Sequence, residues 1–209
     1  FYLIVYMPRP SITSIYTRAQ SDLLIIEGFY RQSKALPANM QGFVAEVLML
    51  RAFSVLEKAI IGVACRVACG VNYRNGVVSN PICVAKSCAD AIVKFKSYNR
   101  NKPLQNLSFT SVGHIGQSVK FVINATEPFR VNLCNYGNQL DEMRRVRNHI
   151  AHRTNNTRAE YKQVLFKRYG ANLKLLPAAF LTSTKRQNRA IIEEYLITIK
   201  VMLDDITRG

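Results

Sequence analysis

Residues 144–153 hold the side chains of this chain that are best suited to chemistry on a phosphate. The segment reads RRVRNHIAHR and contains two of the chain's three histidines among four arginines. Histidine has the ordinary pKa nearest neutrality, and the arginine guanidinium binds phosphate through two hydrogen bonds. Cleavage of RNA by its own 2′-hydroxyl needs proton removal, proton delivery to the leaving oxygen, and positive charge beside the phosphate. Histidine and arginine supply all three, so the segment predicts metal-independent phosphodiester chemistry.

The spacing of these residues decides which of them share a face of a helix. Residues 138–152 are predicted to form one, because apolar side chains recur at helical steps at Leu140, Met143, Val146 and Ile150. Asn148 and His152 are four residues apart and therefore lie on the same face. Arg147 is five residues from His152, so the two converge only if the helix frays or a second surface closes the gap. The polar run at 154–157 predicts such fraying.

The order Arg, Asn, three further residues and His resembles the motif near the end of a bundle helix in HEPN proteins. The residues that match are Arg147, Asn148 and His152. The upstream segment 46–57 is similar to the long early helix of several HEPN branches, with Arg51 and Glu57 as its inward polar residues. The resemblance covers about residues 40–69 and 133–158, whereas the start and the middle of the chain match nothing comparable.

Two other pairings of arginine and histidine exist in the same segment. Arg144 and His149 have the motif's spacing, but Arg145 then occupies the position where HEPN proteins carry a polar residue such as Asn. Arg145 and His152 are separated by more residues than Arg147 and His152, and the residue after Arg145 is the apolar Val146 where the motif has a polar one. Short motifs carry a risk of false matches, so the predicted helix end and the basic, helical chain are needed as context.

The resemblance implies an endoribonuclease that needs no metal and whose site forms where two HEPN domains pair. His152 is then the general acid or base, Arg147 stabilises charge on the phosphate, and Asn148 orients either of them. Further RNA contacts are predicted at Arg144, Arg145, His149, Arg153, Lys185 and Arg186. The resemblance also implies a homodimer, a role as a toxin or in antiviral defence, and a possible acidic antitoxin or regulatory partner. The alternative is a catalytically inactive HEPN module that binds RNA or an acidic protein.

The charge balance independently predicts an anionic partner. The chain has 29 Lys and Arg against 13 Asp and Glu, which gives a formal charge of +16 and a pI near 9.9. Such an excess attracts polyanions and speeds their encounter with the protein, and nucleic acid is the most common one. At 48% hydrophobic residues, the composition is that of a folded domain.

Several function classes lack a sequence signal. The five cysteines contain no CxxC pair and no zinc-like spacing, so free, mostly buried thiols and a cytoplasmic location are predicted. No segment reaches the roughly 18 apolar residues of a membrane span. A Walker loop, a GxGxxG motif and an HExxH motif are also missing from the sequence, so no cofactor or metal is expected.

The pattern of apolar residues predicts the elements that position this segment. Periodicity and breakers place helices at about 12–31, 40–69, 85–98, 112–124, 138–152, 157–169 and 187–206. No alternating strand pattern competes with them. The expected fold is therefore all-α: an up-and-down bundle of about five helices with a loop-rich central insertion. Residues 1–10 are expected to form a short N-terminal arm and 11–209 a single domain.

Overall fold

The computed structural model describes residues 11–184 and 188–209, and regular structure in these ranges is helical apart from one isolated bridge between Asn72 and Val78. The predicted all-α class is therefore confirmed. The predicted arm at 1–10 and the predicted RNA contacts Lys185 and Arg186 lie outside the described residues. None of the described helices has a stretch apolar enough to span a lipid bilayer.

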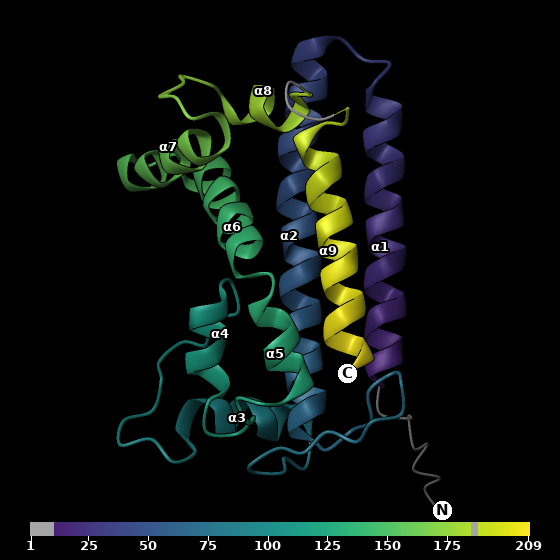
Figure 1. Cartoon of the computed structure of the whole chain (residues 1–209), viewed down its shortest axis with the longest axis vertical. Coiled ribbons are helices and arrows are strands. Elements are labelled where there is room, and N and C mark those ends of the chain that lie inside the picture. Colours follow the sequence, from purple (N-terminus) through teal and green to yellow (C-terminus); the bar gives the residue numbers. More distant parts are fainter. Residues whose placement is uncertain (1–10, 185–187) are drawn as a thin grey trace, which may run out of the picture.

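The described residues form nine helices, where the sequence predicted seven helical segments, about five of them in the bundle (Figure 1). They are α1 (Ile12–Ser33), α2 (Ala38–Ala68), α3 (Cys88–Ser97), α4 (Val112–Val119), α5 (Pro128–Cys134), α6 (Gly137–His152), α7 (Asn155–Tyr169), α8 (Pro177–Thr182) and α9 (Ile191–Arg208). Their buried residues form one shared hydrophobic core. The predicted helices are all present, and the additional ones are the short α5 and α8.

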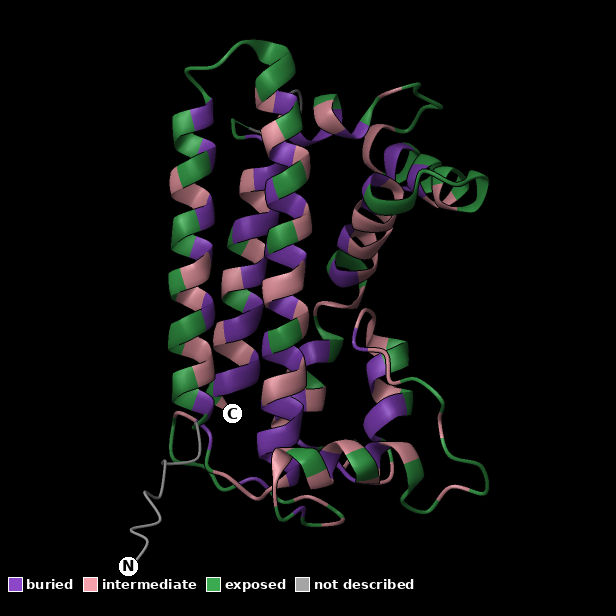
Figure 2. Ribbon diagram, turned by 180° about the vertical axis from the view of Figure 1, so that it is seen from behind, coloured by how far each residue is buried: buried purple, intermediate pink, exposed green. Residues whose placement is uncertain are grey.

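Three long helices form the body of the molecule. α1 and α2 run antiparallel, and α9 packs against both of them (Figure 1). The side of α2 that faces these helices is buried along most of its length, as the purple stretches in Figure 2 show. At Gly62 an added Cβ would lie 3.1 Å from Ile15 Cδ1, so the absence of a side chain there permits the close approach of α1 and α2.

The shorter helices lie on the side of α2 away from α1, where α8, α6 and α3 pack against α2 directly and α7 packs on α6 (Figure 1). α6, α7 and α8 lie toward one end of α2, and α3, α4 and α5 toward the other (Figure 1). The middle segment is loop-rich, as predicted, but it is tied to the core. The buried Tyr73 hydroxyl donates to Glu127 Oε1 at 3.0 Å and accepts from the backbone N–H of Phe129 at 3.2 Å.

The two unpredicted helices both begin at a proline. The Glu127–Pro128 step reads as an interruption in the sequence, but Pro128 is the first residue of α5, and Pro177 is the first residue of α8. Proline fits this position because the N–H that it lacks would have no partner within the helix. α9 begins at Ile191, later than predicted, and the Glu193 side chain there accepts from the backbone N–H of Ala190 at 3.1 Å.

The cysteines follow the prediction only in part. No disulfide joins any of them, and all lie in the described ranges. Cys65 is buried, but Cys134 is exposed and the others are half-buried, so the expectation of mostly buried thiols is wrong. The half-buried ones lie at the end of α2, in the loop after it and at the start of α3, where packing covers them incompletely.

The connection between α6 and α7 is a tight corner. α6 ends at His152, and Arg153 adopts a left-handed conformation with φ of 49°. The Thr154 side chain then accepts from the backbone N–H of Thr157 at 3.3 Å and caps α7. The predicted fraying at 154–157 is therefore wrong, because the polar run satisfies the free N–H groups of the next helix and does not loosen the preceding one.

Removal of this cap should destabilise the corner. Thr154→Ala is expected to lower the free energy of unfolding by about 1 kcal/mol, because a free N–H of the first turn of α7 loses its acceptor. Thr154→Ser should restore most of the loss. The measurement is urea denaturation followed by circular dichroism. Asn156→Ala, an exposed change in the same turn, is the control and should shift stability by less than about 0.5 kcal/mol; equal losses in both variants would contradict the role of the cap.

Candidate functional site

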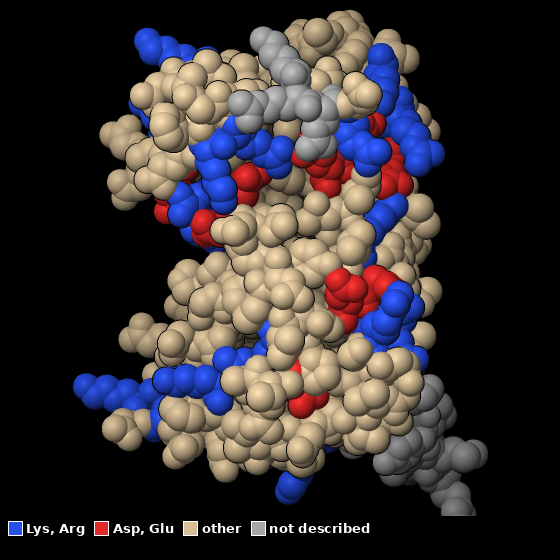
Figure 3. Space-filling model, in the orientation of Figure 1, with Lys and Arg blue, Asp and Glu red and all other residues tan. Residues whose placement is uncertain are grey.

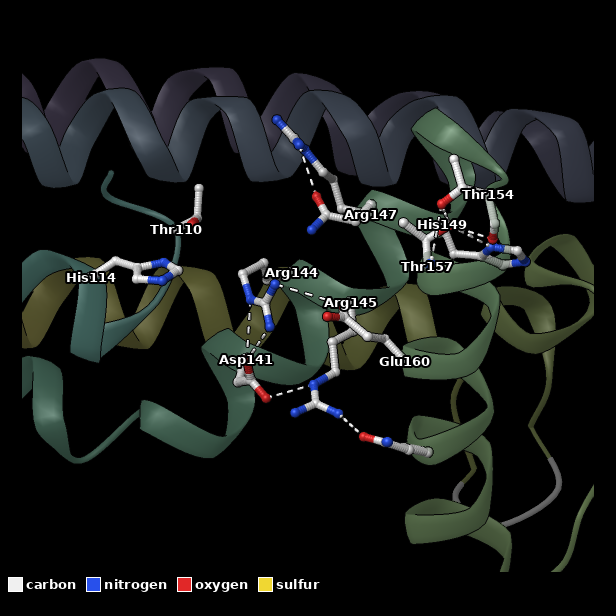
Figure 4. A network of polar contacts seen from close by, with 12 residues as sticks. Thr110, His114, Asp141, Arg144, Arg145, Arg147, His149, Thr154, Thr157 and Glu160 are labelled. Atoms are coloured by element: carbon white, nitrogen blue, oxygen red, sulfur yellow. Dashed lines mark hydrogen bonds and ion pairs between the residues drawn. The ribbon is translucent and has the colours of Figure 1, made fainter. Parts of the chain in front are cut away.

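α6 carries every described residue of the predicted site except Arg153, which follows it directly. Its apolar stripe is buried as predicted, at Leu140, Met143, Val146 and Ile150. This stripe fixes the rotation of the helix between α2 and α7, and thereby decides where each polar side chain points (Figure 4).

Arg147 points to α2 and is held there. Its Nη2 atom lies 3.4 Å from Glu57 Oε2, and its guanidinium lies 5.6 Å from the centre of the Phe53 ring. Burial raises the pKa of Glu57, and the positive charge of Arg147 opposes that rise. Glu57 is thus an inward polar residue as predicted. Arg51 is not, because it is exposed on a different face of α2.

Asn148 and His152 differ in how firmly they are held. The side-chain oxygen of Asn148 accepts from Arg147 Nη1 at 3.0 Å, as Figure 4 shows at Arg147. His152 is exposed in the last position of α6 and makes no hydrogen bond or ion pair within the described part of the chain. Its step of five residues from Arg147 corresponds to about 140° around the helix. Because α6 does not fray, the two side chains do not converge within one chain.

His149 has a packing role that its sequence position did not reveal. Its ring stacks on the ring of Tyr161 in α7, with centres 4.9 Å apart and planes inclined by 20°. Its Nδ1 atom lies 3.3 Å from Thr157 Oγ1. Burial lowers the pKa of His149, and the nearby charges of Arg158 and Arg153 lower it further. The ring is therefore an uncharged contact between α6 and α7 near neutral pH.

Two of the predicted RNA contacts, Arg144 and Arg145, form ion pairs with the same carboxylate, that of Asp141. Arg144 Nη2 and Arg145 Nε lie 2.7 Å from the two oxygens of Asp141, and Arg144 also lies 3.7 Å from Glu160 (Figure 4). Burial by itself would raise the pKa of Asp141, but the hydrogen bonds and charges of these arginines bring it below its ordinary value. The ion pairs offset part of the positive charge that the sequence suggested for RNA.

Arg153 is the most accessible of the predicted RNA contacts on this corner. Its side chain is 68% exposed, although its Nη2 atom lies 3.0 Å from Glu46 Oε2 on α2. Glu46 is only 12% exposed, but the guanidinium of Arg153 keeps further N–H donors open to solvent, so the arginine can contact a second anion. On the face seen in Figure 3, Lys and Arg lie in several separate groups, some of them beside Asp or Glu.

Sequence reasoning named Glu57 as an inward residue but did not pair it with Arg147, and it missed Glu46, although the two glutamates left a signal. Glu46 and Glu57 are eleven residues apart, which brings them to nearly the same face of α2 after three turns. Arg153 and Arg147 of the α6 segment contact them. Two acidic residues on one line of a largely apolar helix thus indicated which face of α2 receives a basic helix. Within the described ranges, no three His, Cys, Asp or Glu side chains are grouped to bind a metal.

The lowered pKa of His149 predicts a pH dependence of stability. As the pH falls, His149 of the unfolded chain binds a proton near the ordinary pKa of 6.5, whereas His149 of the folded protein binds it only at a lower pH. The contribution of His149 is therefore complete above that pH and is lost as the pH falls below it. Urea midpoints of the parent should decline between about pH 7 and pH 5 relative to those of His149→Phe, which keeps the stack and cannot titrate. A difference that does not vary with pH would contradict this.

A second prediction separates the structural role of Arg147 from any chemical one. Arg147→Ala leaves the Glu57 carboxylate half-buried without its partner, so the free energy of unfolding should fall by about 1–2 kcal/mol. Glu57→Gln alone should cost less, and the double variant should be more stable than the sum of the single losses implies. Chemical denaturation of the four proteins gives the coupling; strictly additive losses would show that the pair does not stabilise the fold.

Comparison of the chain with protein-family models, with curated proteins and with solved structures gives no match. The resemblance to HEPN proteins therefore rests on the residues of α2 and α6 alone. What these residues could do follows from the geometry described above.

Proposed function

We propose that this protein is a metal-independent endoribonuclease whose active centre lies at the C-terminal turn of α6. The observation that carries the proposal is the state of His152. It is exposed and makes no hydrogen bond or ion pair with the described residues, whereas Arg144, Arg145, Arg147 and His149 on the same helix all have internal partners. An uncommitted histidine beside arginine is the group that acid–base cleavage of RNA requires.

In this mechanism His152 exchanges a proton with the 2′-hydroxyl or the leaving oxygen. Arg153, the next residue, contacts the phosphate through its solvent-exposed N–H groups, and Arg147 with Asn148 stabilises the charge that develops on it. Arg147 does not reach His152 within one chain, so a second copy must supply the opposite half. A two-fold pair of chains would place two His152 side chains in one cleft, which provides both the acid and the base.

A second candidate function is supported by the surroundings of Arg147. Its contacts with Glu57 and Phe53 are those of a structural residue, and they hold it toward α2. A protein that uses Arg147 only to dock α6 would be a non-catalytic module that binds RNA or an acidic protein through exposed basic residues. Retained RNA affinity without cleavage by a folded preparation would favour this candidate.

The biological setting follows only from the resemblance. A role as a toxin or in antiviral defence, an acidic antitoxin and a cytoplasmic location remain predictions. The chemistry at α6 can be tested without reference to that setting.

The test of the proposal compares two histidines three residues apart. His152→Ala removes the proton carrier and should lower the rate of RNA cleavage by about 10²–10⁴ while RNA affinity stays nearly constant. His149→Phe keeps the stack on Tyr161 and should cleave like the parent. Cleavage is measured with mixed cellular RNA in the presence of EDTA, and the products should carry 2′,3′-cyclic phosphate ends.

Several outcomes would contradict this assignment. Equal rates for the parent and His152→Ala would remove His152 from the mechanism. Products with 3′-hydroxyl ends that require magnesium would contradict the reaction itself. Full activity of a strictly monomeric protein, measured by light scattering under assay conditions, would contradict the paired site.

A further inference from the structure

A groove between α1 and α2 lies outside the site on α6. It has a volume of about 720 Å³. Its apolar lining comes from both helices, with Ile15 and Ala19 from α1 and Val47, Leu50, Val55 and Ala59 from α2. Figure 2 shows these two helices from the side opposite α9, and no other described helix lies over them there. The residues that line the groove run over residues 15–22 of α1 and 47–59 of α2.

Large apolar side chains continue the groove toward the α1–α2 turn. Phe43 is 67% exposed, Met40 54%, Phe29 52% and Ile25 51%. On α2, Met40, Phe43 and Val47 recur at helical steps of three and four residues, so they form one stripe. Soluble proteins rarely expose an extended apolar stripe, and such stripes mark binding surfaces.

The charged residues of the groove define the chemistry of its occupant. They are Arg18, Asp22, Arg51 and Lys58, three cations against one carboxylate. None of the four makes an ion pair within the described ranges, although ion pairs are frequent elsewhere on α2, α6 and α9. The groove thus combines an apolar floor with unneutralised positive charge at its edges.

We propose that this groove binds an amphipathic helix of an acidic partner protein. An apolar stripe of that helix would lie on Phe43, Val47 and Leu50, and its carboxylates would pair with Arg18, Arg51 and Lys58. Recognition of this kind needs apolar side chains at i, i+3 or i+4 and i+7 of the ligand. The stretch of α1 from Ile15 to Phe29 spans fourteen helical steps, or about 21 Å, which accommodates four turns of a partner helix.

The charge excess favours an acidic protein over a second copy of this chain. A second copy would bring the same cationic edges to the groove, and like charges facing each other weaken association. The proposal does not depend on the ribonuclease activity, because none of the groove residues belongs to the site on α6.

The experiment measures binding of two labelled helical peptides to the full chain by fluorescence anisotropy. Both carry leucine at the stripe positions and are about 18 residues long. One carries glutamate beside the stripe, and the other carries lysine at the same positions. We expect the glutamate peptide to bind at least tenfold more tightly. No binding of the glutamate peptide below about 1 mM, or equal affinity of the two, would overturn the proposal.

Variants locate the binding to the groove. Arg51→Glu with Lys58→Glu should weaken the glutamate peptide about tenfold and strengthen the lysine peptide. Lys162→Glu with Lys174→Glu changes the net charge by the same amount outside the groove and should have less than a threefold effect. Phe43→Ser with Val47→Ser should weaken the glutamate peptide at least tenfold without lowering thermal stability, because both side chains are exposed. Loss of affinity in the Lys162 and Lys174 control alone would overturn the proposal.

Other occupants of the groove give different results. If the chain self-associates in sedimentation experiments and Phe43→Ser with Val47→Ser abolishes this, the occupant is a second copy and the proposal is wrong. If removal of residues 1–10 raises peptide affinity tenfold, that segment competes for the groove and the proposal is likewise wrong. The comparison of RNA cleavage by the parent and by His152→Ala does not depend on any of these binding results. Failure of the docking proposal is therefore distinguishable from failure of the proposed activity.

Discussion

The burial of α2 is the constraint on which the rest of the structure depends. This helix packs against α1, α9, α8, α6 and α3, and it contributes the largest share of the buried core. Several of its buried residues, such as Ala45, Ala52 and Ala59, have small side chains, which let neighbouring helices approach closely. Apolar burial of this extent is the main favourable term in folding, so the position of every other helix is set relative to α2.

The second constraint is the line of carboxylates on the α6 side of α2. Glu57 and Glu46 are partly buried and receive Arg147 and Arg153. A half-buried carboxylate without a partner is unfavourable, so these contacts fix how α6 lies along α2. They also divide the arginines by role: Arg147 is held by the fold, whereas Arg153 remains largely exposed. This division makes His152 and Arg153 the accessible part of the proposed ribonuclease site.

α2 thus presents different chemistry on different sides. One face is buried against α9, one carries the carboxylates that hold α6, and one is the open apolar stripe beside α1. Phe43 and Glu46 are only three residues apart, so the end of the open groove lies one turn from the ion pair with Arg153. The proposed activity and the proposed docking surface are separate in their residues but share this helix.

The sequence by itself determined the helical class, the approximate extent of the long helices and the concentration of arginine and histidine in α6. These depend on local periodicity and residue type, which short-range physics sets. It did not predict that residues 154–157 would cap the next helix, or that Pro128 and Pro177 would begin helices. In both cases the same residue types are compatible with a loop and with a helix start, and the neighbouring packing selects between them.

Only the tertiary structure decided which side chains of the predicted site are free. Arg144 and Arg145 pair with Asp141 three and four residues earlier on the same helix, a spacing that a helix itself brings together. Arg147 and His149 instead acquire partners from other helices, because folding brings Glu57 of α2 and Tyr161 of α7 against α6. No local pattern fixes such contacts, since they depend on how helices rotate to bury their apolar faces. His152 is left exposed for the same reason: it lies at the end of α6, beyond the last buried residue of the helix.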